Sequence, residues 1–120
     1  PTMVRVGPRH RGSVRFVNCA FWGPCNRIAV IDGRGTVGFS DCTFVQWGHQ
    51  DDAEAPAIDV LDGTVLLRGN EFQEPKPQVR LGPDVDRAII SENVYRGAWQ
   101  VSNEAEGNVL IKDNLGDGDD

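Results

Sequence analysis

The side chains best suited to chemistry gather in one segment, 45–56, which reads Val-Gln-Trp-Gly-His-Gln-Asp-Asp-Ala-Glu-Ala-Pro. An imidazole can shuttle protons, and carboxylates can act as general acid, general base or nucleophile. We therefore predict four catalytic candidates here: His49, Asp51, Asp52 and Glu54. Glycoside hydrolysis needs two carboxyl groups about 5–9.5 Å apart across the bond. Neighbouring carboxylates such as Asp51 and Asp52 usually point in different directions, so they are not obviously such a pair.

Two tryptophans are the predicted glycan-binding residues, because an indole can stack on the face of a sugar ring. Trp47 belongs to the segment above, and Trp22 directly follows an inward-facing Phe21, so we expect it to face outward before the Gly23-Pro24 turn. The alternatives stay open. The alternative for segment 45–56 is a solvated acidic loop with Trp47 packed against the protein. The alternative for Trp22 is partial burial under the next loop.

Metal and cofactor sites are not predicted. Three cysteines and two histidines show no ligand spacing, and Cys19 and Cys42 are expected to be free core thiols. Three aspartates near the end suggest calcium (Asp117, Asp119 and Asp120), but no calcium motif supports it. Residues 117–120 are instead predicted to be a flexible acidic tail.

Charge and length exclude several classes of partner. The chain has 120 residues, 12 of them basic and 18 acidic, with a net charge of −6. A phosphate backbone rewards clustered Lys and Arg, which this chain lacks, so neither nucleic acid nor an anionic membrane is an expected partner. No apolar run approaches the roughly 20 residues that span a bilayer.

The chain must position these residues with a repeat that occurs five times. The segments run from Gly12 to Phe21, Gly35 to Phe44, Gly63 to Phe72, Asp86 to Tyr95 and Gly107 to Gly116. In each, apolar residues alternate as in Val14 and Phe16, which predicts a strand with one buried face. The next inward residue then comes three positions later, so we expect a corner. The predicted corner residues are Asn18, Asp41, Gly69, Glu92 and Asp113, of which Glu92 is the one type unsuited to a left-handed backbone.

Two columns follow the corner in every repeat. The first is a predicted Asn/Cys ladder of Cys19, Cys42, Asn70, Asn93 and Asn114, and the second is an aromatic ladder of Phe21, Phe44, Phe72 and Tyr95. Another strand precedes each repeat, with expected inward pairs such as Ile28 and Val30 or Trp99 and Val101. The prediction is an all-β, right-handed, single-stranded parallel β-helix of about five coils over residues 1–116. An antiparallel sandwich is the alternative, and it leaves both columns unexplained.

The repeat Val-x-Phe-x-Asn/Asp-Cys/Asn-x-Phe resembles that of the pectate-lyase-like superfamily of right-handed β-helices, from Val4 to Asn114. The resemblance implies a secreted or periplasmic protein that acts on polysaccharide as a glycoside hydrolase or lyase. Catalytic motifs of the polygalacturonase-like members are not matched: Gly48-His49 is followed by Gln50, and no Arg-x-Lys occurs.

We therefore expect the C-terminal β-helix portion of a polysaccharide-active enzyme, mainly scaffold and in part glycan groove, with polysaccharide or oligosaccharide as partner. The alternative is a non-enzymatic β-helix for glycan binding, adhesion or oligomer assembly, as in tailspikes. The first coil starts at Val4 without a cap, and an open rung exposes unpaired backbone groups. We expect upstream coils, or another copy of the chain, to cover it.

Overall fold

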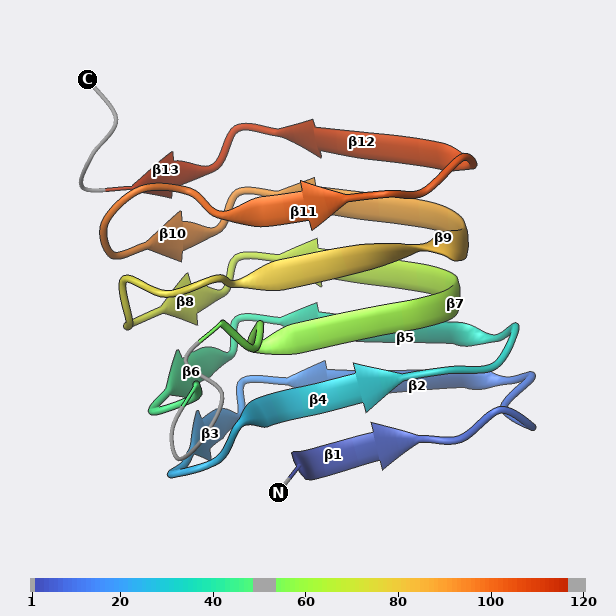
Figure 1. Ribbon diagram of the computed structural model, residues 1–120, viewed down its shortest axis with the longest axis horizontal. Helices are drawn as coiled ribbons and strands as arrows, with labels where there is room; N and C mark the ends of the chain where they lie inside the picture. Colours follow the sequence, from blue (N-terminus) through green and yellow to red (C-terminus); the bar gives the residue numbers. More distant parts are fainter. Residues whose placement is uncertain (1, 49–53, 117–120) are drawn as a thin grey trace.

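The computed structural model describes residues 2–48 and 54–116, and there the chain winds into a right-handed parallel β-solenoid of five coils (Figure 1). All strand pairs in the described part are parallel, and each coil lies on the previous one. The predicted fold class is confirmed. No helix long and apolar enough to cross a membrane occurs in these ranges.

Each coil contributes to three walls, named here by their strands. The first wall holds β1 (Thr2–Val6), β4 (Arg27–Ile31), the first half of β7 (Ile58–Arg68), the first half of β9 (Val79–Ser91) and β11 (Val101–Asn103). The second wall holds β2 (Ser13–Val17), β5 (Thr36–Ser40), the second halves of β7 and β9, and β12 (Asn108–Lys112). The third wall holds β3 (Ala20–Trp22), β6 (Thr43–Val45), β8 (Glu71–Phe72), β10 (Val94–Tyr95) and β13 (Leu115–Gly116).

The second wall follows the predicted alternation. Phe16 pairs with Phe39, Phe39 with Leu67, Leu67 with Ile90 and Ile90 with Ile111, so the same repeat position points inward in every coil. The three middle members of this row are fully buried, whereas the two end members are only partly buried. The core is thus a continuous column whose ends are less covered than its centre.

A left-handed residue turns the chain between the second and third walls in all five coils. The φ angles are 56° at Asn18, 56° at Asp41, 71° at Gly69, 60° at Glu92 and 59° at Asp113. Because a single residue in this conformation redirects the chain, the alternation resumes one position out of phase, as the sequence predicts. Glu92 adopts the same angle as the others although its type is poorly suited to it.

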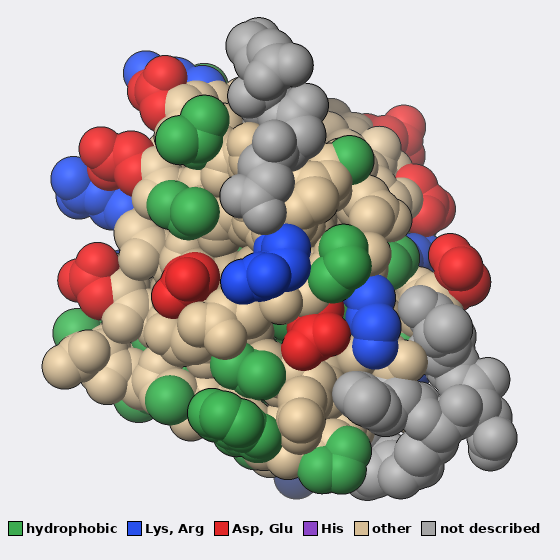
Figure 2. Space-filling model, turned by 90° about the vertical axis from the view of Figure 1, so that its left-hand side faces the viewer, with side chains coloured by type: hydrophobic (Ala, Val, Ile, Leu, Met, Phe, Trp, Pro, Cys, Tyr) green, Lys and Arg blue, Asp and Glu red, His purple; other side chains and the backbone are tan. Residues whose placement is uncertain are grey.

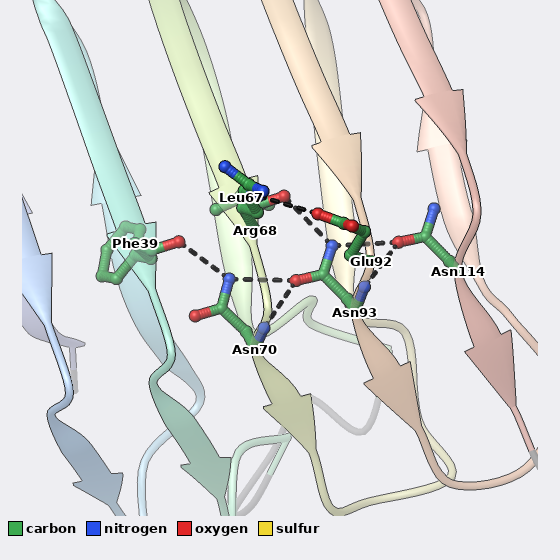
Figure 3. A network of polar contacts seen from close by, with 7 residues as sticks. All are labelled: Phe39, Leu67, Arg68, Asn70, Glu92, Asn93 and Asn114. Atoms are coloured by element: carbon green, nitrogen blue, oxygen red, sulfur yellow. Dashed lines mark hydrogen bonds and ion pairs between the residues drawn. The ribbon is translucent and has the colours of Figure 1, made fainter.

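The asparagine ladder lies directly after this corner (Figure 3). Asn70 donates from Nδ2 to Asn93 Oδ1 at 3.0 Å, and Asn93 donates from Nδ2 to Asn114 Oδ1 at 3.0 Å. Each Nδ2 also donates to a carbonyl of the preceding coil, for example Asn93 to Leu67 O at 3.1 Å. Cys42 continues the column, since its backbone N–H donates to Asn70 Oδ1 at 2.9 Å. The ladder satisfies amides that would otherwise be buried without partners.

The aromatic ladder forms beside it on the third wall. Phe21 stacks on Phe44 with ring centroids 5.3 Å apart, and Phe44 stacks on Phe72 at 4.8 Å. Tyr95 pairs with Phe72 in the strand register, and its ring lies 4.4 Å from that of Trp99. The four predicted members therefore share one column.

The predicted inward residues of the first wall are confirmed in β7 and β9, where Ile58 pairs with Val79 and Val60 with Leu81, but those predicted for β4 are wrong. Val4 and Val6 pair with Ala29 and Ile31, so the inward residues of β4 are not Ile28 and Val30. In β11 the strand register aligns Val101 with the buried Val79, and Trp99, which lies just before this strand, is partly buried against the core, as predicted. The run Ile-Ala-Val-Ile is apolar on both faces, and alternation cannot fix the register of such a run.

Candidate functional site

The predicted catalytic segment is described only at its ends. His49, Asp51 and Asp52 lie outside the described residues, and the proposed acidic tail 117–120 does too. Glu54 is described and exposed, four residues before β7 begins at Ile58. Glu54 is therefore the one predicted catalytic candidate whose surroundings can be stated.

Trp47 lies in the core, with 0% of its surface exposed. Its Nε1 donates to Pro77 O at 2.8 Å, and its ring meets that of Phe72 edge-on at 6.1 Å. Lys76 Nζ donates to Trp47 O at 3.0 Å and fixes the backbone as well. The interpretation of Trp47 as an exposed sugar platform does not hold, because both faces of the indole are covered. The alternative, Trp47 packed against the coil, describes the structure.

Trp22 lies on the outside at the end of β3, with 64% of its surface exposed. It pairs with Val45 in the strand register of the third wall. Figure 2 shows this wall, where hydrophobic, basic and acidic side chains are interspersed. The small hollow described there, between Glu71 and Arg96, has a volume of about 60 Å³. Trp22 is thus accessible, and its glycan-binding role stays a prediction.

A larger cleft lies over the first wall, beside the end of the predicted catalytic segment. Its volume is about 410 Å³. Its described lining combines one carboxylate, one guanidinium, an amide, a hydroxyl and an indole with apolar residues: Glu54, Pro56, Pro77, Val79, Arg80, Trp99, Gln100, Val101 and Ser102. These groups come from three successive coils, which parallel stacking brings together.

An ion-pair network holds Arg80 in this cleft. Asp59 accepts hydrogen bonds from Arg80 Nη1 at 3.2 Å and from Arg27 Nε at 3.1 Å, and only 10% of the Asp59 side chain is exposed. Glu104 lies on the other side of the guanidinium, 3.3 Å from Arg80 Nε. The hydrogen bond to Asp59 raises the pKa of Arg80 above its usual value. Arg80 is therefore a fixed cation whose position does not depend on a ligand.

The second wall carries an outward apolar row of Leu66, Ile89 and Leu110. A hollow of about 540 Å³ borders this row on the side of Thr64 and Arg87, and another of about 480 Å³ borders it on the side of Arg68 and Lys112. Arg87 Nε donates to Thr64 Oγ1 at 3.2 Å, which holds this guanidinium against the wall. This surface offers area for a partner but few groups that converge on one point.

No cluster of three or more metal-ligating side chains lies within residues 2–48 and 54–116. The three cysteines are free thiols, and burial raises the pKa values of Cys25 and Cys42.

Sequence reasoning missed Arg80, Gln100 and Ser102. Arg80 and Ser102 pair in the strand register, so they are outward neighbours on adjacent coils. Their signal is one repeat position carrying polar outward residues in successive coils. The inward positions of Val79 and Val101 place Arg80 and Ser102 outward, but alternation alone does not show that a cleft forms there.

Comparison with protein-family models, with curated proteins and with solved structures finds no match to this chain. The fold stands on the structure itself, and the resemblance to the pectate-lyase-like superfamily stays a prediction from the repeat.

Proposed function

We propose that this chain is the β-helix portion of a secreted or periplasmic polysaccharide-active enzyme, a glycoside hydrolase or polysaccharide lyase, and that glycan binds in the cleft over the first wall. The observation that carries the proposal is the lining of that cleft. Glu54, Arg80, Gln100 and Ser102 offer donors and acceptors for sugar hydroxyls beside the indole of Trp99.

The arrangement of the cleft suits an extended polymer. Coils repeat about every 4.8 Å along the solenoid, so outward groups on neighbouring coils form a ladder of contacts along its axis. Arg80 is held by Asp59 before any ligand arrives, which lowers the ordering cost of binding. Glu54 is the carboxylate of the described lining and the candidate general acid or base.

Binding is tested by isothermal titration calorimetry with polygalacturonate, xylan, alginate and β-glucan. We expect at least one of them to bind, and Gln100→Ala to weaken that binding about three- to tenfold through loss of one hydrogen-bonding group. Asn108→Ala, which removes an exposed amide from the second wall, is the matched control and should bind as the parent does. Absence of binding to all four polymers, or equal affinity of the two variants, contradicts the proposal.

The second candidate function is a non-enzymatic β-helix for glycan binding, adhesion or oligomer assembly. The exposed row of Ile89 and Leu110 on the second wall favours it, because apolar side chains grouped outside mark interaction surfaces. Product analysis separates the two functions. New reducing ends or unsaturated products from the bound glycan, lost in Glu54→Gln, indicate the enzyme. Binding without products indicates the alternative.

A further inference from the structure

Two thiols occupy the same position on adjacent coils. Cys19 and Cys42 each follow the left-handed corner residue of their coil, and Thr43 N donates to Cys19 O at 2.9 Å. The flanking pairs, Val17 with Ser40 and Ala20 with Thr43, place the cysteines side by side in the ladder. Adjacent parallel strands lie about 4.8 Å apart, which falls within the roughly 4.4–6.8 Å between Cα atoms of disulfide-bonded cysteines.

Both side chains belong to the inward column, and that of Cys42 reaches toward the first coil. Cys42 Sγ lies 3.4 Å from Phe16 O of that coil, and Cys19 Sγ lies 3.5 Å from Val17 O. Burial raises the pKa of the Cys42 thiol. The two thiols therefore lie in adjacent coils of the same stack, with the Cys42 side chain directed toward the coil that carries Cys19.

The two thiols differ in access. Cys19 is partly exposed in the less covered first coil, whereas Cys42 is only 1% exposed. A small reagent reaches Cys19 first. Cys25 is buried elsewhere, with its Sγ 3.9 Å from Gln46 O, and shares no column with the other two.

We propose that Cys19 and Cys42 form a reversible disulfide between the first and second coils when the protein meets a low-molecular-weight disulfide. The Cys19 thiolate attacks one sulfur of the reagent, forms a mixed disulfide and releases one reagent thiol. The Cys42 thiolate then attacks Cys19 Sγ, the Cys19–reagent bond breaks, and the second reagent thiol leaves. The two cysteines are oxidised by two electrons and the reagent disulfide is reduced to two thiols.

Such a bond clamps the first coil and remains reducible. Side chains in register on parallel strands hold their Cβ atoms near the strand spacing of about 4.8 Å, slightly beyond the roughly 3.8 Å typical of disulfides. The bond therefore draws the coils together with some strain, and strained disulfides are the easily reduced ones.

The test uses the whole chain incubated with oxidised glutathione, denatured, alkylated and digested with chymotrypsin. Cleavage after Phe21 or Trp22 separates Cys19 from Cys25, so mass spectrometry can assign each thiol. We expect a cross-linked pair of peptides that carry Cys19 and Cys42, with Cys25 alkylated. Amides of β1–β3 should exchange hydrogen several-fold more slowly in the oxidised protein, and dithiothreitol should reverse both effects.

Variants sharpen the result. Cys25→Ser should still form the cross-link, and Cys42→Ser should stop at glutathione on Cys19, because no second thiol resolves it. Glutathione that persists on Cys19 of the parent chain, a cross-link that includes Cys25, or alkylation of all three thiols overturns the proposal. If Cys42→Ser does not fold, the peptide map of the parent chain decides the matter alone.

Discussion

Trp47 and Trp22 differ in burial, so their replacement should affect stability to different extents. Trp47→Ala removes a fully buried indole and its hydrogen bond to Pro77 O, so we expect a loss of about 3–5 kcal/mol in the free energy of unfolding. Trp22→Ala removes an exposed side chain and should change that energy by about 0.5 kcal/mol or less. Urea denaturation of both variants is the measurement. A loss as large in Trp22→Ala as in Trp47→Ala would contradict the placement of both residues.

Asn93 is the middle rung of the amide ladder. Asn93→Leu leaves the backbone N–H of Asn70 and the carbonyl of Leu67 without their partners, so we expect a loss of about 2–4 kcal/mol. Asn103 ends β11, and its Oδ1 accepts a hydrogen bond from Ala105 N at 3.0 Å, so its replacement also removes a contact. Asn108 is therefore the better control, since it is exposed in β12, and Asn108→Leu should cost little. Equal shifts in the denaturation midpoints of the Asn93 and Asn108 variants would refute the ladder.

Cys42 stands where the ladder changes from amides to thiols. Its Sγ lies 3.4 Å from Phe16 O of the preceding coil. Asn70 makes the equivalent contact one coil further on, where its Nδ2 donates to Phe39 O. An asparagine at position 42 can donate a hydrogen bond from Nδ2 to Phe16 O and can offer Oδ1 as an acceptor to the first coil. We expect Cys42→Asn to raise the free energy of unfolding by about 1 kcal/mol under reducing conditions.

Cys25→Asn is the control for that change. Cys25 is as buried as Cys42 but has no amide column beside it, so an amide there should destabilise by about 1–3 kcal/mol. Chemical denaturation with a reductant present measures both variants. Destabilisation of similar size in both would show that position 42 cannot extend the ladder.

At the residue scale, sequence reasoning succeeded where a residue type recurs at fixed spacing. The amide and aromatic columns were predictable because similar residue types recur at the same repeat position in successive coils. Trp47 lies in the one long insertion, where no second copy shows whether the indole points in or out. Its burial depends on Phe72 and Pro77 of the next coil, contacts that local spacing does not encode.

At the scale of elements, the left-handed corner between the second and third walls has nearly the same backbone angle in every coil. Glu92 holds a φ of 60°, which a side chain of its type adopts at a cost and Asn tolerates better. Its ion pair with Arg68, at 2.7 Å, joins two exposed side chains and contributes little. The backbone effect should dominate, so we expect Glu92→Asn to raise the free energy of unfolding by about 0.5–1 kcal/mol.

Glu92→Gln separates the two effects, because it removes the charge and keeps the backbone preference. We expect its thermal midpoint to stay close to that of the parent chain while Glu92→Asn unfolds at higher temperature. If both variants unfold earlier, the ion pair outweighs the corner.

The sequence predicts the register of some strands and not of others. The second wall was predicted correctly because its strands alternate strictly, with one buried face. In the first wall the register of β4 was predicted wrongly, since Ile28 and Val30 are apolar on the face opposite Ala29 and Ile31. Val30 occupies an outward row between Arg5 and Asp59, yet it is only 7% exposed. The cleft residues escaped prediction because strand alternation shows which side chains face outward but not where a cleft forms.

Over the whole molecule, the stack behaves as a one-dimensional array in which each coil contacts only its neighbours. The number of coils was predictable because the sequence contains five copies of the repeat, one for each coil. The distribution of burial along the stack follows from this geometry. Val65, Leu67 and Ile90 of the third and fourth coils are fully buried, whereas Val14 of the first coil is 36% exposed and Val109 of the fifth is half-buried.

This gradient predicts how the protein opens. The strands β7 and β9 run unbroken through two walls and pair along most of their length, so their amides need the largest opening before they exchange. The amides of β2 and β12 lie in coils with one coil neighbour each among the described residues, and fewer contacts oppose their release. Native-state hydrogen exchange read by NMR or mass spectrometry should therefore give the slowest rates in β7 and β9, with rates rising toward both ends. Uniform protection across the coils would mean that the stack opens as one cooperative unit, and neighbour-only coupling would then be wrong.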